Sequence, residues 1–138
     1  MMQKMKILIV DDEAIFVMSL ERALKQAGYD VCDSALSGEE ALAKVKEENP
    51  DLVILDLCLN CETSGVETAN RIRSISNIPI VFISGLIKEE IENEIKEIGG
   101  SAYLTKPFAP EDLITAIQKI SANKTCFVTR RHGDDEVF

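Results

Sequence analysis

Short apolar runs that end on a charged or hydroxyl-bearing residue recur along the chain. Four such runs stand out with their terminal groups: 6–10 before Asp11-Asp12, 52–55 before Asp56, 78–84 ending on Ser84, and 102–105 before Lys106. Continuous apolar runs of this length, rich in β-branched residues, indicate strands that are buried on both faces. Such strands are typical of a parallel sheet covered by helices.

Segments with helical periodicity alternate with these runs. Apolar residues recur at helical spacing in five segments: 16–27, 38–48, 66–75, 87–98 and 110–122. Ser37 and Glu40 have capping-box spacing, and Gly28 suits the position after a helix. A less apolar strand is expected at 29–35, at the sheet's edge, and an irregular loop at 57–64. The alternation predicts an α/β fold with a five-stranded, doubly wound parallel sheet and five helices in three layers.

Length and composition favour one soluble domain. The 138 residues suit a single domain at 1–122 followed by a tail at 123–138, which is expected to be partly disordered or the start of a linker. A net charge of −9 disfavours nonspecific binding to nucleic acid or to anionic membranes. No apolar run is long enough to span a bilayer, and no signal peptide precedes the first run. We therefore expect a cytoplasmic protein.

The four cysteines do not suggest a disulfide framework. Cys58 and Cys61 have C-x-x-C spacing, but they supply only two of the four ligands of a structural zinc site, and the single histidine, His132, lies in the tail. Two incidental thiols in a loop are the simpler interpretation.

The terminal groups of the strands are the candidate chemistry. Parallel strands bring their carboxyl ends to one edge, so Asp11, Asp12, Asp56, Ser84 and Lys106 are expected to converge there. Clustered carboxylates repel one another unless a cation lies between them, and their hard oxygens favour Mg²⁺. Lysine and hydroxyl groups suit the oxygens of a phosphoryl group, which Asp56 would accept as a nucleophile. Alternatively, one aspartate caps the first helix and the lysine is a surface charge.

The sequence resembles the response regulator receiver domains of two-component signalling. The matching motifs are 9–13 (IVDDE), 55–56 (LD), 83–85 (ISG) and 103–108 (YLTKPF), and the resemblance extends over about 6–122. It implies the flavodoxin-like strand order 2-1-3-4-5. It also implies a signalling switch rather than an enzyme, with a histidine kinase or phosphotransfer protein as phosphodonor and a downstream protein effector. No direct binding to nucleic acid and no membrane insertion are expected.

Individual roles also follow from the resemblance. Phosphate from phosphohistidine would be received by Asp56, and the phosphoryl group would be contacted by Ser84, Gly85 and Lys106. The residues expected to hold Mg²⁺ are Asp12 and Asp56 directly, Asp11 largely through water, and Cys58 through its backbone carbonyl. The Lys106-Pro107 peptide would be cis.

Signal output is expected to involve Tyr103. This residue matches the family's switch aromatic, and its hydroxyl would leave solvent as the side chain swings behind the fourth strand. The surface of the fourth helix, fifth strand and fifth helix would then change. One departure from the family pattern concerns the rim of the site: Asn60 replaces the usual proline, and Gly65 comes one residue late, which indicates a one-residue insertion.

Two other functions are possible for an aspartate at such a strand end. A phosphatase or phosphotransferase of the haloacid dehalogenase type would use an aspartyl-phosphate, but such enzymes have D-x-D where this chain has Asp56-Leu57-Cys58, and they need a cap domain. A receiver-like binding module without phosphorylation is disfavoured by the complete set of acidic, hydroxyl and lysine residues. The chain is expected to be either a stand-alone receiver or part of a longer protein.

Overall fold

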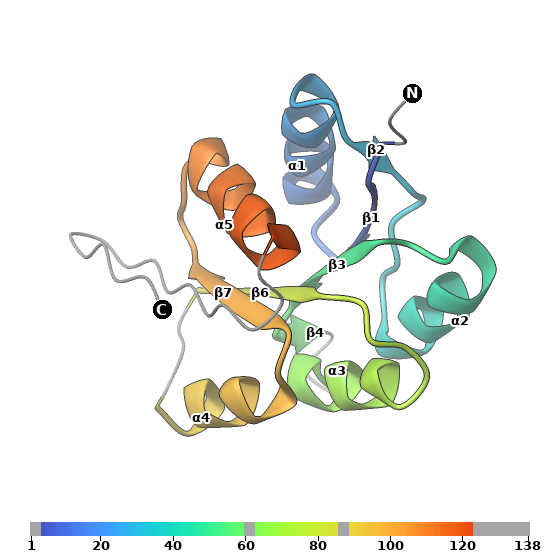
Figure 1. Cartoon of the computed structure of the whole chain (residues 1–138), viewed down its shortest axis with the longest axis vertical. Helices are drawn as coiled ribbons and strands as arrows, with labels where there is room; N and C mark the ends of the chain where they lie inside the picture. Colours follow the sequence, from blue (N-terminus) through green and yellow to red (C-terminus); the bar gives the residue numbers. More distant parts are fainter. Residues whose placement is uncertain (1–3, 60–62, 86–88, 123–138) are drawn as a thin grey trace.

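The computed structural model describes residues 4–59, 63–85 and 89–122 (Figure 1). Seven strands are present in this part of the chain: β1 Lys6–Val10, β2 Asp30–Val31, β3 Leu52–Asp56, β4 Cys58–Leu59, β5 Thr63–Ser64, β6 Ile80–Ser84 and β7 Ser101–Thr105. The helices are α1 Ala14–Gln26, α2 Gly38–Glu48, α3 Gly65–Arg73, α4 Glu89–Ile98 and α5 Pro110–Ala122.

A five-stranded parallel sheet forms the centre of the fold. Its order is β2-β1-β3-β6-β7, which is the predicted 2-1-3-4-5 order once the short β4–β5 pair is set aside. Val10 is in register with Leu55, and Asp56 with Ile83. The carboxyl ends of β1, β3 and β6 are therefore level at one edge. The predicted fold class is confirmed.

Helices cover both faces of the sheet (Figure 1). α1 and α5 pack on one face, against a cluster that includes Ile9 and Ile54, and α2, α3 and α4 pack on the other, against Leu8 and Leu55. All five residues of β3 are buried, as expected for a strand with apolar neighbours on both faces. Because every position of β3 and β6 is buried, the backbone that carries Asp56 and Ser84 is packed on both faces.

The predicted helix ends are largely those observed. Ser37 Oγ accepts a hydrogen bond from the Glu40 backbone N–H at 3.2 Å. Gly28, just after the C-cap of α1, has a φ of +97°, which a residue with a side chain rarely adopts. Asn49 ends α2 in the left-handed region, with a φ of 49°.

Three local predictions were wrong. The strand expected at 29–35 is only the two-residue β2, followed by an isolated bridge between Val10 and Ala35. Beyond Val31 the chain keeps single backbone bonds to β1, from the Cys32 N–H to the Ile7 carbonyl and from the Ala35 N–H to the Ile9 carbonyl, both at 2.9 Å, without a continuous ladder. The segment 57–64 is not wholly irregular, since β4 and β5 form a short antiparallel pair. Ile75 lies beyond the end of α3 and its side chain is 46% exposed.

Some predictions concern residues outside the described part of the chain. These are the tail at 123–138 and, in the loop with the expected insertion, Asn60 and Cys61. In the described part, no helix combines the length and the apolar character that crossing a membrane would require.

Candidate functional site

The three predicted aspartates meet at the carboxyl edge of the sheet. Asp11 and Asp12 follow β1, Asp56 ends the neighbouring β3, and one carboxylate oxygen from each lies within 4.8 Å of the others. Asp11 is fully buried and Asp56 is 5% exposed, whereas Asp12 is exposed. Buried carboxylates this close together repel each other strongly unless a cation or a proton lies between them.

Of the two carboxylate oxygens of Asp11, one accepts a backbone hydrogen bond and the other does not. Oδ1 accepts a hydrogen bond from the Glu13 backbone N–H at 2.8 Å. Glu13 is itself the N-cap of α1, and the helix has no side-chain cap bond, so the alternative in which an aspartate caps this helix is wrong. Oδ2 is buried and accepts no hydrogen bond from the part of the chain that the structure describes. Burial raises the pKa of Asp11 to about 6, and the nearby Asp56 contributes, although the Glu13 hydrogen bond opposes the shift. The bond to Glu13 uses only Oδ1, and Oδ2 is left to interact with a cation.

The ammonium of Lys106 lies among the carboxylates. Its Nζ is 3.1 Å from Glu13 Oε1, 3.6 Å from Asp11 Oδ2 and 3.8 Å from Asp56 Oδ2. Burial alone would lower the pKa of Lys106, but the Glu13 hydrogen bond and the charges of Asp56 and Asp11 raise it above its ordinary value. The peptide bond to Pro107 is cis, as the resemblance implies. The lysine is thus a charged group in the site rather than an isolated surface cation.

Ser84 ends β6, the strand next to β3, and Gly85 follows it. The Ser84 side chain is 8% exposed, and its carbonyl accepts a hydrogen bond from the Lys106 backbone N–H at 2.7 Å. The Leu57 backbone N–H donates to the Ile83 carbonyl at 3.0 Å, which ties the residue after Asp56 to the residue before Ser84. The sheet edge is therefore one connected backbone unit around the candidate acceptor.

Gly65 is required by the close approach of α3 to the site. A Cβ at this position would lie 2.5 Å from the Asp56 carbonyl oxygen and 2.6 Å from the Leu57 Cα, closer than real Cβ atoms come. The Gly65 N–H also donates to the Leu57 carbonyl at 3.0 Å. Gly65, which comes one residue late relative to the family pattern, thus allows the start of α3 to lie directly against the backbone of Asp56 and Leu57. The expected role of the Cys58 carbonyl stays a prediction.

Tyr103 occupies an inward position. It lies on β7 and is 1% exposed, in the apolar cluster that also contains Phe82 and Ile95. The predicted switch assigns this inward position to the phosphorylated state. The swing itself stays a prediction, because one conformation is described.

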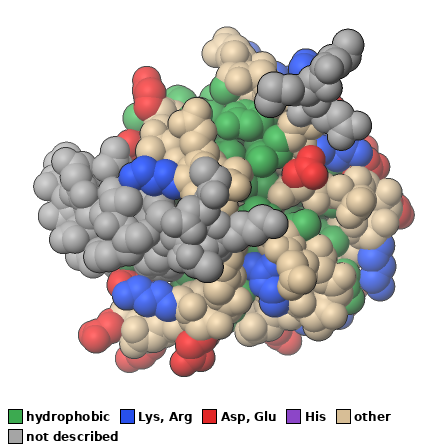
Figure 2. Space-filling view, in the orientation of Figure 1, with side chains coloured by type: hydrophobic (Ala, Val, Ile, Leu, Met, Phe, Trp, Pro, Cys, Tyr) green, Lys and Arg blue, Asp and Glu red, His purple; other side chains and the backbone are tan. Residues whose placement is uncertain are grey.

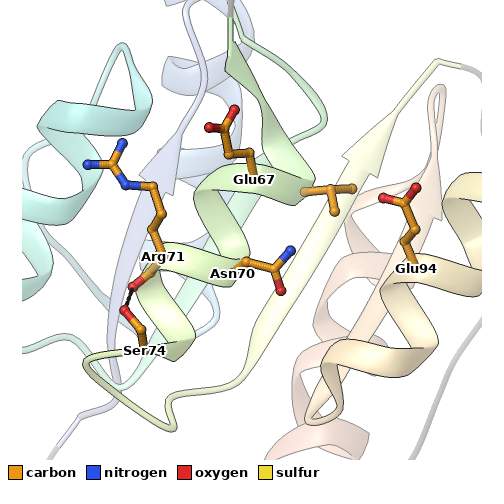
Figure 3. A pocket seen from close by; sticks show the side chains of 6 residues that line it. Glu67, Asn70, Arg71, Ser74 and Glu94 are labelled. Carbon is orange, nitrogen blue, oxygen red and sulfur yellow. Dashed lines mark hydrogen bonds between the residues drawn. The ribbon is translucent and has the colours of Figure 1, made fainter.

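A surface hollow of about 430 Å³ lies between α3 and α4 (Figure 3). Its lining comprises Val66, Glu67, Asn70, Arg71, Ser74 and Glu94. The Ser74 hydroxyl donates to the Arg71 carbonyl at 2.6 Å, so part of its polar lining is bonded within α3 and the turn after it. None of the charged groups at the strand ends borders this hollow. The chemistry at the sheet edge is separate from it.

Sequence reasoning missed two neighbours of Lys106. Glu13 was part of a matching motif but had no assigned role, and Phe16 was expected to be a core residue of α1. Phe16 does pack against the core cluster under α1 and α5, but it is only partly buried, and its ring centroid is also 4.2 Å from Lys106 Nζ. The available signal was the position of both residues in or just after the motif at the end of the first strand.

Comparison with known proteins shows which family this chain belongs to. Residues 7–118 match the response regulator receiver domain family, which is most of the chain. This chain belongs to the response regulator receiver family. It is homologous to the chemotaxis protein CheY of Thermotoga maritima, with 33% identity over 84% of this chain and 97% of that protein. A CheY-like receiver domain protein from Methanospirillum hungatei JF-1 has a similar structure, with a TM-score of 0.82, 27% identity and coverage of 88% of this chain and 97% of that one.

Other relatives of this receiver domain are longer. The probable transcriptional regulator ycf27 of Porphyridium aerugineum is 40% identical over 86% of this chain, which spans 49% of that protein. The phosphate regulon transcriptional regulatory protein PhoB of Pseudomonas aeruginosa is 38% identical over 83% of this chain and half of its own length. The chain thus spans about half the length of these two relatives, and what it shares with them is the receiver domain.

Proposed function

We propose that this receiver is a phosphorylation switch in which Asp56 accepts a phosphoryl group from a phosphohistidine. One observation carries the proposal: the strand ends bring Asp56 together with two further aspartates and with Lys106, whose Nζ is 3.8 Å away. A carboxylate oxygen of Asp56 attacks phosphorus while the bond from phosphorus to the histidine nitrogen breaks, and the imidazole leaves with the electron pair. The product is an acyl phosphate on the end of β3.

Mg²⁺ fits the donor set at this edge. Three carboxylates supply hard oxygen ligands, and Asp11 Oδ2 is buried with no hydrogen bond among the described residues. We propose Asp12 and Asp56 as direct ligands, Asp11 as a ligand through water, and the Cys58 carbonyl as the backbone ligand. When bound, Mg²⁺ lowers the repulsion among the carboxylates and offsets the negative charge of the phosphoryl oxygens.

The remaining groups of the site would contact the phosphoryl oxygens. The Lys106 ammonium is already at this edge and needs to exchange one anionic partner for another. The Ser84 hydroxyl and the Gly85 backbone would be drawn toward the same oxygens, because a phosphoryl group brings about −1.5 to −2 charge and strong acceptors. Movement of Ser84 would give Tyr103 two positions. The surface formed by α4, α5 and β7, the fifth strand of the sheet, would differ between these positions; we call it the α4–β7–α5 surface.

The phosphodonor is proposed to be a histidine kinase or a phosphotransfer protein in the cytoplasm. Two side chains on the outer face of α1, Ile15 and Met18, are 85% and 63% exposed, and they follow closely after Asp12 in the sequence. Exposed apolar groups beside a charged site suit contact with a partner protein. We therefore place the donor over α1.

The effector is proposed to bind the α4–β7–α5 surface. The first turn of α4 carries Glu89, Glu90 and Glu92, and acidic side chains gather along the rim formed by α4 (Figure 2). Complementarity with this acidic helix predicts a basic contact surface on the effector.

The direct test is to incubate the chain with Mg²⁺ and acetyl phosphate and to measure its intact mass. We expect one phosphoryl group per chain, lost slowly, and no adduct in Asp56→Asn, which keeps the shape but not the nucleophile. Rapid multiple turnover of a phosphate ester would instead indicate the phosphatase alternative. An unmodified wild-type protein would indicate a binding module, and an adduct on Asp56→Asn would refute the assignment of the acceptor.

A further inference from the structure

Lys106 contacts an aromatic ring as well as the carboxylates of the site. Its Nζ is 4.2 Å from the centroid of the Phe16 ring, within the range at which a cation is attracted to an aromatic face. The lysine side chain is 21% exposed, so water screens this contact only in part. The ammonium is therefore bounded by acidic oxygens and by the Phe16 ring.

The Phe16 ring is itself held in place. It packs edge-to-face against Phe108, with ring centroids 6.1 Å apart and an interplanar angle of 83°. Both rings also pack against the buried cluster under α1 and α5. Phe108 lies two residues after Lys106, so the segment that carries the lysine also carries one of the two packed rings. Such a ring is a fixed surface for the flexible lysine side chain.

We propose that Phe16 is a positioning residue for Lys106. The nearest anion, Glu13 Oε1 at 3.1 Å, belongs to a side chain that is 64% exposed, and exposed ion pairs are weak and easily exchanged. A phosphoryl group would compete with Glu13 for the ammonium because both are anions. It does not compete with the neutral ring, so the Phe16 contact persists while the lysine changes partners.

Positioning of this kind favours binding of the phosphoryl group. A lysine has a flexible four-carbon stem, and restricting it before the phosphoryl group arrives reduces the conformational entropy lost on binding. The ring contact is present before and after binding, so its own energy cancels, and what the ring contributes is the restriction of the lysine side chain in advance. Loss of the ring face should therefore weaken that binding about two- to five-fold, the lower part of the range for immobilising one flexible side chain. This inference rests on the proposed function, because it assigns the residue that orients Lys106 toward the phosphoryl group.

The test compares Phe16→Leu with Phe16→Tyr. Leucine keeps an apolar side chain but removes the aromatic face, whereas tyrosine keeps the face and serves as the matched control. The first measurement is the NMR chemical shift of the Lys106 ε-methylene group without ligands. Ring currents should move this signal upfield in the wild type and in Phe16→Tyr, and the displacement should disappear in Phe16→Leu. Packing alone would not produce this pattern.

The second measurement is the affinity for beryllofluoride with Mg²⁺, followed by NMR titration. We expect Phe16→Leu to bind about two- to five-fold more weakly and Phe16→Tyr to bind like the wild type. Equal losses in both variants, or a Lys106 signal that is the same in the wild type and Phe16→Leu, would overturn the inference. A wild-type protein that binds no beryllofluoride would overturn the proposed function, and the NMR shift would still report whether the lysine lies over the ring.

Discussion

Neutralising Asp11 should stabilise the domain at neutral pH in the absence of Mg²⁺. The pKa of Asp11 is raised from 3.8 to about 6, first by burial and also by the charge of Asp56. The folded state therefore holds a proton that the unfolded chain releases between about pH 4 and pH 6. Because the folded state binds more protons in this window, stability falls as the pH rises through it and levels off above about pH 6.

The size of the effect follows from the same shift. The difference between 3.8 and about 6, at about 1.36 kcal/mol for each pKa unit, corresponds to about 3 kcal/mol lost when Asp11 ionises in the folded protein. Asp11→Asn removes this loss and can still accept the Glu13 N–H bond through its amide oxygen. Its free energy of unfolding should exceed that of the wild type by up to about 3 kcal/mol above pH 6 and approach it near pH 4.

Urea unfolding with a chelator present, followed by circular dichroism at several pH values, measures this difference. Asp12→Asn is the matched control, because the Asp12 side chain is exposed and its neutralisation should change stability less. Adding Mg²⁺ should stabilise the wild type more than Asp11→Asn, because the cation offsets the repulsion that the substitution has already removed. If Asp11→Asn is no more stable than the wild type at pH 7.5 without Mg²⁺, the burial argument is wrong.

Three further predictions concern the rim and output of the site. Gly65→Ala should lower the free energy of unfolding by about 1–3 kcal/mol and slow phosphorylation by acetyl phosphate, because its Cβ would overlap the Asp56 carbonyl. Gly85→Ala, where a Cβ meets nothing within 4 Å, should change stability little, and equal losses of stability in the two variants would contradict this prediction. Ser84→Ala should still become phosphorylated, while NMR shifts on the α4–β7–α5 surface respond less to beryllofluoride; an undiminished response would remove Ser84 from the coupling. Ile15→Glu should slow phosphotransfer from a donor protein about tenfold or more and leave phosphorylation by acetyl phosphate unchanged, which two parallel kinetic assays would separate.

Much of the fold was predictable from sequence because its signals are local. A short continuous apolar run rich in β-branched residues, such as 52–55, favours a strand buried on both faces, and the structure buries every residue of β3. Ser37 and Gly28 mark their helix ends through the chemistry of one or two residues. The convergence of Asp11, Asp12 and Asp56 also followed, because parallel strands place their carboxyl ends at a common edge.

The tertiary structure decided what depends on distance between remote segments. Helical periodicity places Phe16 on the core-facing side of α1, but its contact with Lys106 depends on how α1 meets the chain after β7, which no periodicity within α1 encodes. The same holds for the ion pair between Glu13 and Lys106, whose partners are 93 residues apart in the chain. The burial that raises the pKa of Asp11 arises only when the sheet and its helices surround it. A residue's type and local pattern determine the element that it joins, but its electrostatic surroundings are set by neighbours that only the packed fold brings near.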